Sequence, residues 1–145
     1  MKNAIDELAA AIDDLLTRDL QAIDWNTKPD PNRWSRKEIM GHLIDSAQIN
    51  LQRFVRCTYE ENFKLTYEQV EWVQVQQYQE ADINDILELW RLLNFQIIRV
   101  WKNYPTDRLQ ATCDNSKHDV QLHTVEFLAQ DYVEHMKGHL AVVIG

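Results

Sequence analysis

Glycine and proline are both scarce in this chain, with three of each in 145 residues. Such a chain has few tight turns and few helix breaks, which excludes collagen-like and low-complexity architectures and disfavours many short strands. The composition therefore favours long helices joined by a small number of loops.

Cysteine is rarer still, and the two residues, Cys57 and Cys113, form no motif. A disulfide framework is excluded, and we expect two free thiols in a reducing compartment. Neither cysteine has a partner in the sequence that would indicate cysteine catalysis.

Basic residues are outnumbered by acidic ones, 15 against 23, which gives a net charge of −8. Nucleic-acid partners need a basic surface, and anionic membranes attract one, so both are disfavoured. No apolar run approaches the roughly 18 residues of a membrane span. The acidic, periodic opening does not resemble a signal peptide. We expect one soluble, cytoplasmic domain over residues 1–145.

Apolar residues recur every three or four positions in several long segments, a spacing typical of amphipathic helices. The first series runs from Ile5 to Ile23 and ends before the loop "DWNTKPDPNR". A second helix is expected over Arg36–Arg56, because Ser35 and Glu38 form an S-x-x-E capping box at its start.

The second half of the chain shows the same spacing. A short helix is expected within residues 66–78, a long helix from near Asp82 to before Pro105, and a last helix from Val125, with Thr124 as its N-cap. Residues 113–123 are interpreted as a loop. Four long helices predict an all-α four-helix bundle, with residues 57–81 long enough to form a crossover. Four aromatic residues are assigned to the core: Trp72, Trp90, Trp101 and Tyr132.

Three histidines are candidate metal ligands. His135 and His139 lie four apart, hence on one face of the last helix, and His42 lies on the second helix. Three imidazoles with an open fourth position describe a catalytic zinc site, provided that the two helices pack together. The H-x-x-x-H spacing alone is a weak signal, since it also arises by chance.

The neighbours of these histidines carry two further hypotheses. Gly41 and Gly138 each precede a candidate ligand and would permit close helix approach, although glycine is sometimes only tolerated in helices. Asp131 lies one turn before His135, where a carboxylate would orient the imidazole, act as a base or fill the open position; otherwise it is a solvated surface charge. Two other acids, Asp45 and Glu134, are interpreted as ordinary helix-surface charges.

The stretches "WSRKEIMGHLIDSAQINLQRF" and "DYVEHMKGHL" together resemble the DinB-like superfamily, which includes the YfiT-like proteins. The resemblance covers nearly the whole chain and implies that His42, His135 and His139 bind a divalent ion, most often zinc or nickel. It also implies an up-down-down-up bundle and a homodimer. The chain has only six residues after His139, unlike some thiol-transferase relatives, so the resemblance does not fix the substrate.

Three functions compete. The leading hypothesis is a metal-dependent transferase that joins a low-molecular-weight thiol, such as bacillithiol, to a small-molecule electrophile. The resemblance implies this chemistry, because some members of the superfamily carry it out. The alternatives are a metal-dependent hydrolase that uses water activated by the metal, and a non-enzymatic, metal-stabilised binding or stress protein. The sequence H-E-x-x-H is absent, because Met136 occupies the glutamate position.

Arg53 is the one candidate substrate-binding residue away from the histidines. It follows His42 by eleven residues, about 16 Å along the same helix. That places it too far from the ion to bind it, but near enough to contact a long, anionic ligand. The competing interpretation is an ion pair with a carboxylate from another helix.

Overall fold

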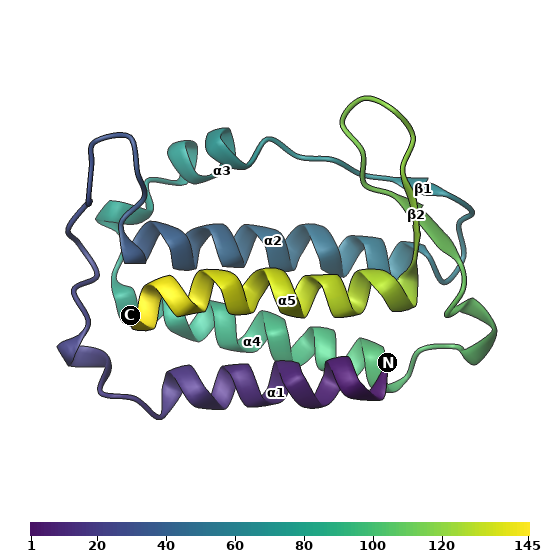
Figure 1. Ribbon diagram of the computed structural model, residues 1–145, viewed down its shortest axis with the longest axis horizontal. Helices are drawn as coiled ribbons and strands as arrows, with labels where there is room; N and C mark the ends of the chain where they lie inside the picture. Colours follow the sequence, from purple (N-terminus) through teal and green to yellow (C-terminus); the bar gives the residue numbers. More distant parts are fainter.

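A computed structural model describes all 145 residues. Four long helices form a bundle: α1 (Lys2–Leu16), α2 (Arg36–Arg56), α4 (Ile83–Lys102) and α5 (Val125–Ile144). Figure 1 shows α1 and α5 running in one direction and α2 and α4 in the other. Each helix packs on two neighbours, in the order α1, α4, α2, α5 around the bundle. The long link between α2 and α4 is what allows these two parallel helices to lie side by side.

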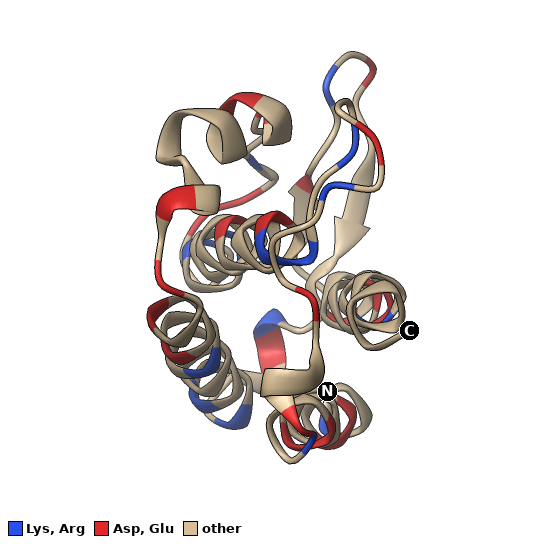
Figure 2. Ribbon diagram, turned by 90° about the vertical axis from the view of Figure 1, so that its left-hand side faces the viewer, with Lys and Arg blue, Asp and Glu red and all other residues tan.

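The bundle is closed by apolar side chains that all four helices contribute. Its fully buried residues include Leu8 and Ile12 of α1, Leu43 and Phe54 of α2, Trp90 and Ile97 of α4, and Val133 and Met136 of α5. Figure 2, viewed along the helices, shows acidic residues on each of the four long helices. None of the helices contains a stretch both long and apolar enough to cross a lipid bilayer.

The helix starts follow the capping chemistry that the sequence predicts. The Ser35 hydroxyl accepts from the Glu38 amide and the Glu38 carboxylate accepts from the Ser35 amide, which completes the capping box of α2. Asp82 caps α4 and Thr124 caps α5 in the same way, each through a side-chain oxygen. These helices therefore begin at the residues expected from sequence.

The first helix ends earlier than its apolar series. The Thr17 hydroxyl donates to the Asp13 carbonyl and Asp19 accepts from the Gln21 amide, so local side-chain bonds replace the helical pattern after Leu16. Leu20 lies instead in a short 3-10 turn, Leu20–Ala22, and Ile23 directly follows it; both residues pack on the core.

The crossover between α2 and α4 holds the short helix α3 (Gln69–Gln76) and a 3-10 turn, Tyr78–Glu80. It also holds the strand β1 (Phe63–Lys64), which the sequence did not reveal. Trp72 is only half-buried and packs edge-on against Tyr67, whereas the other three aromatic residues assigned to the core are buried.

The segment interpreted as a loop before α5 contains two strands, β2 (Thr112–Asp114) and β3 (Leu122–Thr124). They pair antiparallel, while β1 pairs parallel with β2, so the sheet order is β1-β2-β3. The prediction of a plain loop is therefore wrong. Strands of two or three residues are too short to show an alternating pattern, and the Asp114 carboxylate organises the turn by accepting from the amides of Ser116 and Gln121.

Both cysteines are buried free thiols. Cys57 follows the last residue of α2 and Cys113 lies on β2, so the sheet covers them. Their burial leaves cysteine catalysis unsupported, as expected from the sequence.

Candidate metal centre

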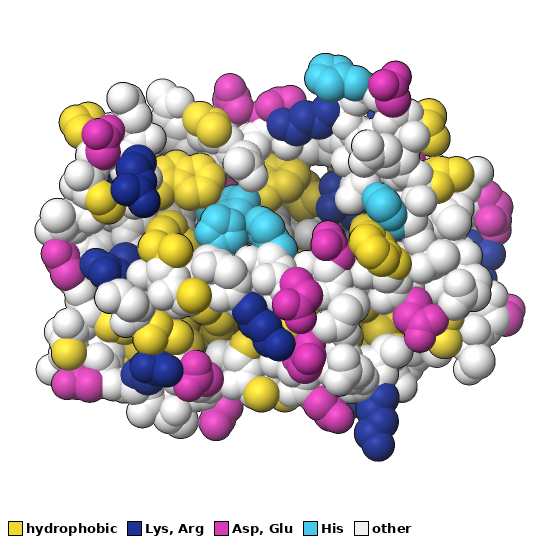
Figure 3. Space-filling view, in the orientation of Figure 1, with side chains coloured by type: hydrophobic (Ala, Val, Ile, Leu, Met, Phe, Trp, Pro, Cys, Tyr) yellow, Lys and Arg dark blue, Asp and Glu magenta, His cyan; other side chains and the backbone are white.

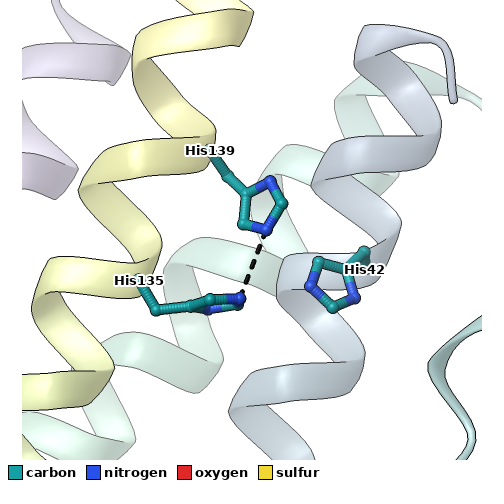
Figure 4. A group of neighbouring side chains, drawn as sticks. All are labelled: His42, His135 and His139. Carbon is teal, nitrogen blue, oxygen red and sulfur yellow. Dashed lines mark hydrogen bonds between the residues drawn. The ribbon is translucent and has the colours of Figure 1, made fainter. Parts of the chain in front are cut away.

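The three candidate histidines meet in the space between α2 and α5. Figure 4 shows His135 and His139 reaching from successive turns of α5 toward His42 on α2. One potential ligand atom from each ring lies within 4.8 Å of the others. Since α2 and α5 are neighbours in the bundle, the packing that builds the core also brings these rings together.

The spacing of the two histidines on α5 suits a metal ion. Their Nε2 atoms are 3.2 Å apart. Two nitrogen ligands at tetrahedral angles around zinc are separated by about 3.3 Å, given zinc–nitrogen bonds of about 2.0–2.1 Å. Two neutral imidazole lone pairs this close repel each other unless a proton or a cation lies between them. The pair is therefore well placed to bind a cation.

His42 is the buried member of the group. Its Nε2 side faces the other two rings in Figure 4, while Nδ1 is buried without a hydrogen-bond partner. The Trp34 ring covers one side of the imidazole, with the ring centroids 4.9 Å apart. A ring held in this way presents one nitrogen to the space between the helices, which is what metal ligation requires.

All three imidazoles are neutral at pH 7. Burial lowers the pKa of His42 to about 3, with smaller contributions from His139 and His135. Partial loss of hydration also lowers the pKa of His135, although that residue is exposed overall, and the pKa of His139. Protons therefore do not compete with a cation for the ring nitrogens.

The fourth side of the site faces solvent. His135 is exposed and His139 is half-buried, and no carboxylate or cysteine joins the three rings. Figure 3 shows a group of histidine side chains at the surface near the middle of the view, with hydrophobic side chains beside it. A cation held here would keep a position open for a small ligand.

Asp131 lies near the site but does not bind His135. It is exposed, it lines a cavity together with His135, and its charge acts to raise the pKa of that histidine. No hydrogen bond joins the two side chains, so the carboxylate does not orient the imidazole in this structure. The exposed position fits a solvated surface charge as well as a base beside the site, so the role of Asp131 as a base stays a prediction.

Asp45 corrects the sequence interpretation, because it is fully buried rather than on the surface. Its Oδ1 accepts from the Tyr78 hydroxyl at 2.7 Å and from the Gln76 amide at 2.8 Å. Burial raises the pKa of this carboxyl. Asp45 therefore ties the crossover to α2 one turn after His42. Its partners lie more than 30 positions along the chain, and no local pattern indicates them. Glu134 is exposed, as expected.

The two glycines have different environments, and neither brings α5 close to α2. A Cβ on Gly41 would lie 2.2 Å from the Tyr78 ring, so this glycine makes room for the crossover. Nothing lies within 4 Å of the corresponding position on Gly138. The hypothesis of close helix approach is therefore wrong for both residues.

Arg53 is buried at the far end of the cavity that also contains His135. Its Nε donates to the Leu65 carbonyl at 3.2 Å and its Nη1 donates to the Asn50 side chain at 3.2 Å. No carboxylate pairs with it, so the predicted alternative of an ion pair is wrong.

Several cavity residues gave no signal in the sequence. The polar cavity beside His135 is lined by residues of α2, α5, the crossover and the β2–β3 turn: Ser46, Asn50, Arg53, Tyr67, Gln69, Asn115, Leu128, Asp131, Tyr132 and His135. A second cavity touches His139 and is lined in part by Trp34, Ile39, Val70 and Val142. Both cavities combine distant segments, which spacing along a single helix does not reveal.

Comparison with known proteins places this arrangement in a family. The model of the DinB superfamily matches residues 4–143. Among solved structures, YfiT from Bacillus subtilis has a TM-score of 0.80 at 18% identity, over 98% of this chain and 81% of that one. YfiT is described as a probable metal-dependent hydrolase with an unusual four-helix bundle topology. No curated protein sequence matches significantly. The chain belongs to the DinB superfamily.

Proposed function

We propose that this chain is a metal-dependent enzyme that acts on a small molecule, with His42, His135 and His139 as the metal ligands and hydrolysis as the reaction. The observation that carries the proposal is the convergence of three neutral imidazoles at a site with one side open. The description of YfiT as a probable metal-dependent hydrolase supports the reaction type.

The donor set indicates what a cation would supply here. A divalent ion held by three neutral imidazoles keeps its double positive charge, and so lowers the pKa of a water or thiol ligand. Three nitrogen donors suit zinc or nickel. The chain supplies the shape of the site: α5 presents two rings side by side, and Trp34 holds the ring of His42 in place.

Asp131 is the acid that we assign as the proton acceptor. It is the only carboxylate lining either of the two cavities beside the histidines. It lies one turn before His135, on the solvent side, where it can accept a proton from a nucleophile and release it to water.

A thiol transferase is the second candidate function. The histidines lie between two separate cavities, a polar one beside His135 and a larger, more apolar one beside His139. A transfer reaction brings two reactants together, and each cavity offers space for one. In this version a low-molecular-weight thiol, such as bacillithiol, replaces water as the nucleophile.

Metal content comes first in the test. Purified protein should contain close to one zinc or nickel ion per chain, and His42→Ala, His135→Ala and His139→Ala should each lose it. Two histidines outside the site, His118 and His123, provide matched controls, and their alanine variants should keep full occupancy. Retention of the ion by His42→Ala would show that α2 contributes no ligand.

Turnover separates the functions. Protein reloaded with zinc or with nickel is assayed against a panel of esters, amides and alkyl halides, with and without an added thiol. Hydrolysis without thiol supports the first proposal, and product formed only with thiol supports the second. Asp131→Asn should slow either reaction while the bound metal stays. If the ion is present and no turnover occurs, the non-enzymatic, metal-stabilised alternative is favoured.

A further inference from the structure

The cavity beside His135 has a charged far end. It measures about 170 Å³ and lies between α2 and α5, beneath the crossover and the β2–β3 turn. On α5 it extends from His135 to Leu128, which is about 10 Å at 1.5 Å per residue. On α2 it extends to Arg53. A small molecule bound along this cavity would therefore have one end at the histidines and the other at a guanidinium.

Arg53 is held in a fixed orientation. Its side chain is only 8% exposed. The Nε and Nη2 groups both donate to the Leu65 carbonyl, and Nη1 donates to the Asn50 side chain. A guanidinium has five N–H donors, so this arrangement leaves two of them free. The crossover thus positions the group and leaves part of its hydrogen-bonding capacity unused.

The charge of Arg53 has no counter-ion in the protein. No carboxylate pairs with Arg53 or acts on its pKa, although the chain as a whole carries a net charge of −8. Nearby Tyr67 is neutral, because burial raises its pKa to about 12. The nearby Cys113 sulfur lies 3.0 Å from the Phe63 carbonyl, to which a protonated thiol would donate, whereas the Cys57 thiol and the charge of Arg53 lower the pKa of Cys113. Burying an unpaired charge is unfavourable, and a bound anion would offset that cost.

We propose that the Arg53 end of this cavity is a subsite for an oxyanion, so that the substrate is a small molecule with a carboxylate or phosphate group at the end remote from its reacting atom. Its role as a substrate subsite rests on the proposed metal-dependent function. Asn50 and Tyr67 line the same end and offer further polar contacts. Asp131 lines the cavity nearer to His135 and repels an anion there. The two charges therefore orient the ligand with its anionic end toward Arg53.

Anion binding is tested on metal-free protein, so that no probe binds through the ion. Succinate and inorganic phosphate are the anionic probes, and succinamide is the neutral control for succinate. Calorimetry should show binding of at least one anion and none of succinamide. The anion that binds with the higher affinity shows whether the site prefers a carboxylate or a phosphate.

Two arginine variants localise the binding. Arg53→Met keeps the apolar stem and should weaken anion binding roughly tenfold or more, since a charged hydrogen bond contributes about 1.5–3 kcal/mol. The matched control is Arg91→Met, an exposed arginine on α4, which should bind as the wild type does. Asp131→Asn removes the repelling charge and should strengthen binding.

An NMR signal of Arg53 itself tests the proposal in wild-type protein, even if Arg53→Met does not fold. The Nε–H of Arg53 is buried and hydrogen-bonded, so it should give a separate NMR resonance, assigned by its absence in Arg53→Lys. Succinate or phosphate should shift this resonance in wild-type protein, and succinamide should not. An unmoved resonance, or equal affinity in wild type and Arg53→Met, would overturn the proposal.

A variant of Cys113 tests whether the Cys113 sulfur is itself the counter-charge of Arg53. If the Cys113 sulfur were ionised and paired with Arg53, wild-type protein would bind no anion and Cys113→Ala would bind one, which also overturns the proposal. Equal binding by both supports it. Metal content is measured on separate samples. Anion binding at Arg53 in a protein that takes up no metal would retain the subsite and reject the proposed function.

Discussion

At the residue scale, single side chains have roles that their types alone do not reveal. Asp45 looked like a surface charge and is buried, whereas Gly41 looked like a contact point for α5 and instead faces the Tyr78 ring. Both residues owe their environment to one segment, the crossover. Its position depends on contacts far apart in the chain, so no local spacing in α2 predicts it.

The two glycines make a matched pair of mutations. Gly41→Ala should lower the free energy of unfolding by about 1–3 kcal/mol, because the added Cβ meets the Tyr78 ring at 2.2 Å. Gly138→Ala should raise it by up to about 1 kcal/mol, because helix propensity improves and nothing obstructs the methyl group. Urea denaturation measures both. Equal effects of the two changes would contradict the position of the Tyr78 ring.

Asp45 predicts a dependence of stability on pH. Burial raises the pKa of its carboxyl in the folded state, so the folded protein binds more protons than the unfolded chain between the two pKa values. The Asp45 carboxyl therefore destabilises the folded protein least below the pKa that it has in the unfolded chain. As the pH rises from there through its pKa in the folded state, the free energy of unfolding falls. Asp45→Asn keeps the acceptor for Tyr78 and Gln76 and removes the charge.

The gain in stability from Asp45→Asn should be larger at pH 7 than at pH 4. Denaturant unfolding at both pH values measures it, with Asp6→Asn on the exposed face of α1 as the control for loss of one negative charge. A gain that is the same at both pH values would mean that Asp45 titrates normally.

At the element scale, helix starts are predictable because caps are local. Ser35 and Glu38 lie three residues apart and satisfy each other's amides, so four letters of sequence suffice to place the start of α2. The end of α1 and the strands β1, β2 and β3 were not predicted. The end of α1 depends on side-chain bonds around Thr17, and β1 depends on pairing with β2, about 50 positions away. The strands β2 and β3 are close in sequence but too short to show an alternating pattern.

The caps of α2 and α5 should differ in strength. Ser35→Ala removes the oxygen that accepts from Glu38 and also a hydroxyl that donates to Gln79 in the crossover. Thr124→Ala removes only a cap to the Phe127 amide. The first change should cost about 1–2 kcal/mol or more and the second about 1 kcal/mol. Thermal or urea unfolding compares them; an equal loss would show that the bond to Gln79 contributes nothing.

At the scale of the whole molecule, the candidate site depends on how α2 and α5 pack. The sequence indicated the three histidines, and the bundle brings them together, because each lies on the face that its helix turns toward the other. The cavities were not predictable in this way, since the crossover and the β2–β3 turn supply part of their walls. The predicted homodimer stays a prediction.

A cation at the histidines would join the two halves of the chain. His42 and His139 are 97 positions apart, so the unfolded chain does not hold the three rings together. A ligand that binds only the folded state raises the free energy of unfolding by about 2.7 kcal/mol when its free concentration is 100 times Kd. Zinc or nickel added to metal-free protein should therefore raise the Tm, and chelation should reverse the rise.

The histidine variants make this shift specific. His42→Ala, His135→Ala and His139→Ala should each lose most of the rise in Tm, while His118→Ala, on the β2–β3 turn, should keep it. Loss in His42→Ala is the informative result, because His135 and His139 alone lie on one helix and would not link α5 to α2. If His42→Ala keeps the full rise, the ion is held by α5 alone, and the open three-histidine site on which the proposed chemistry depends does not form.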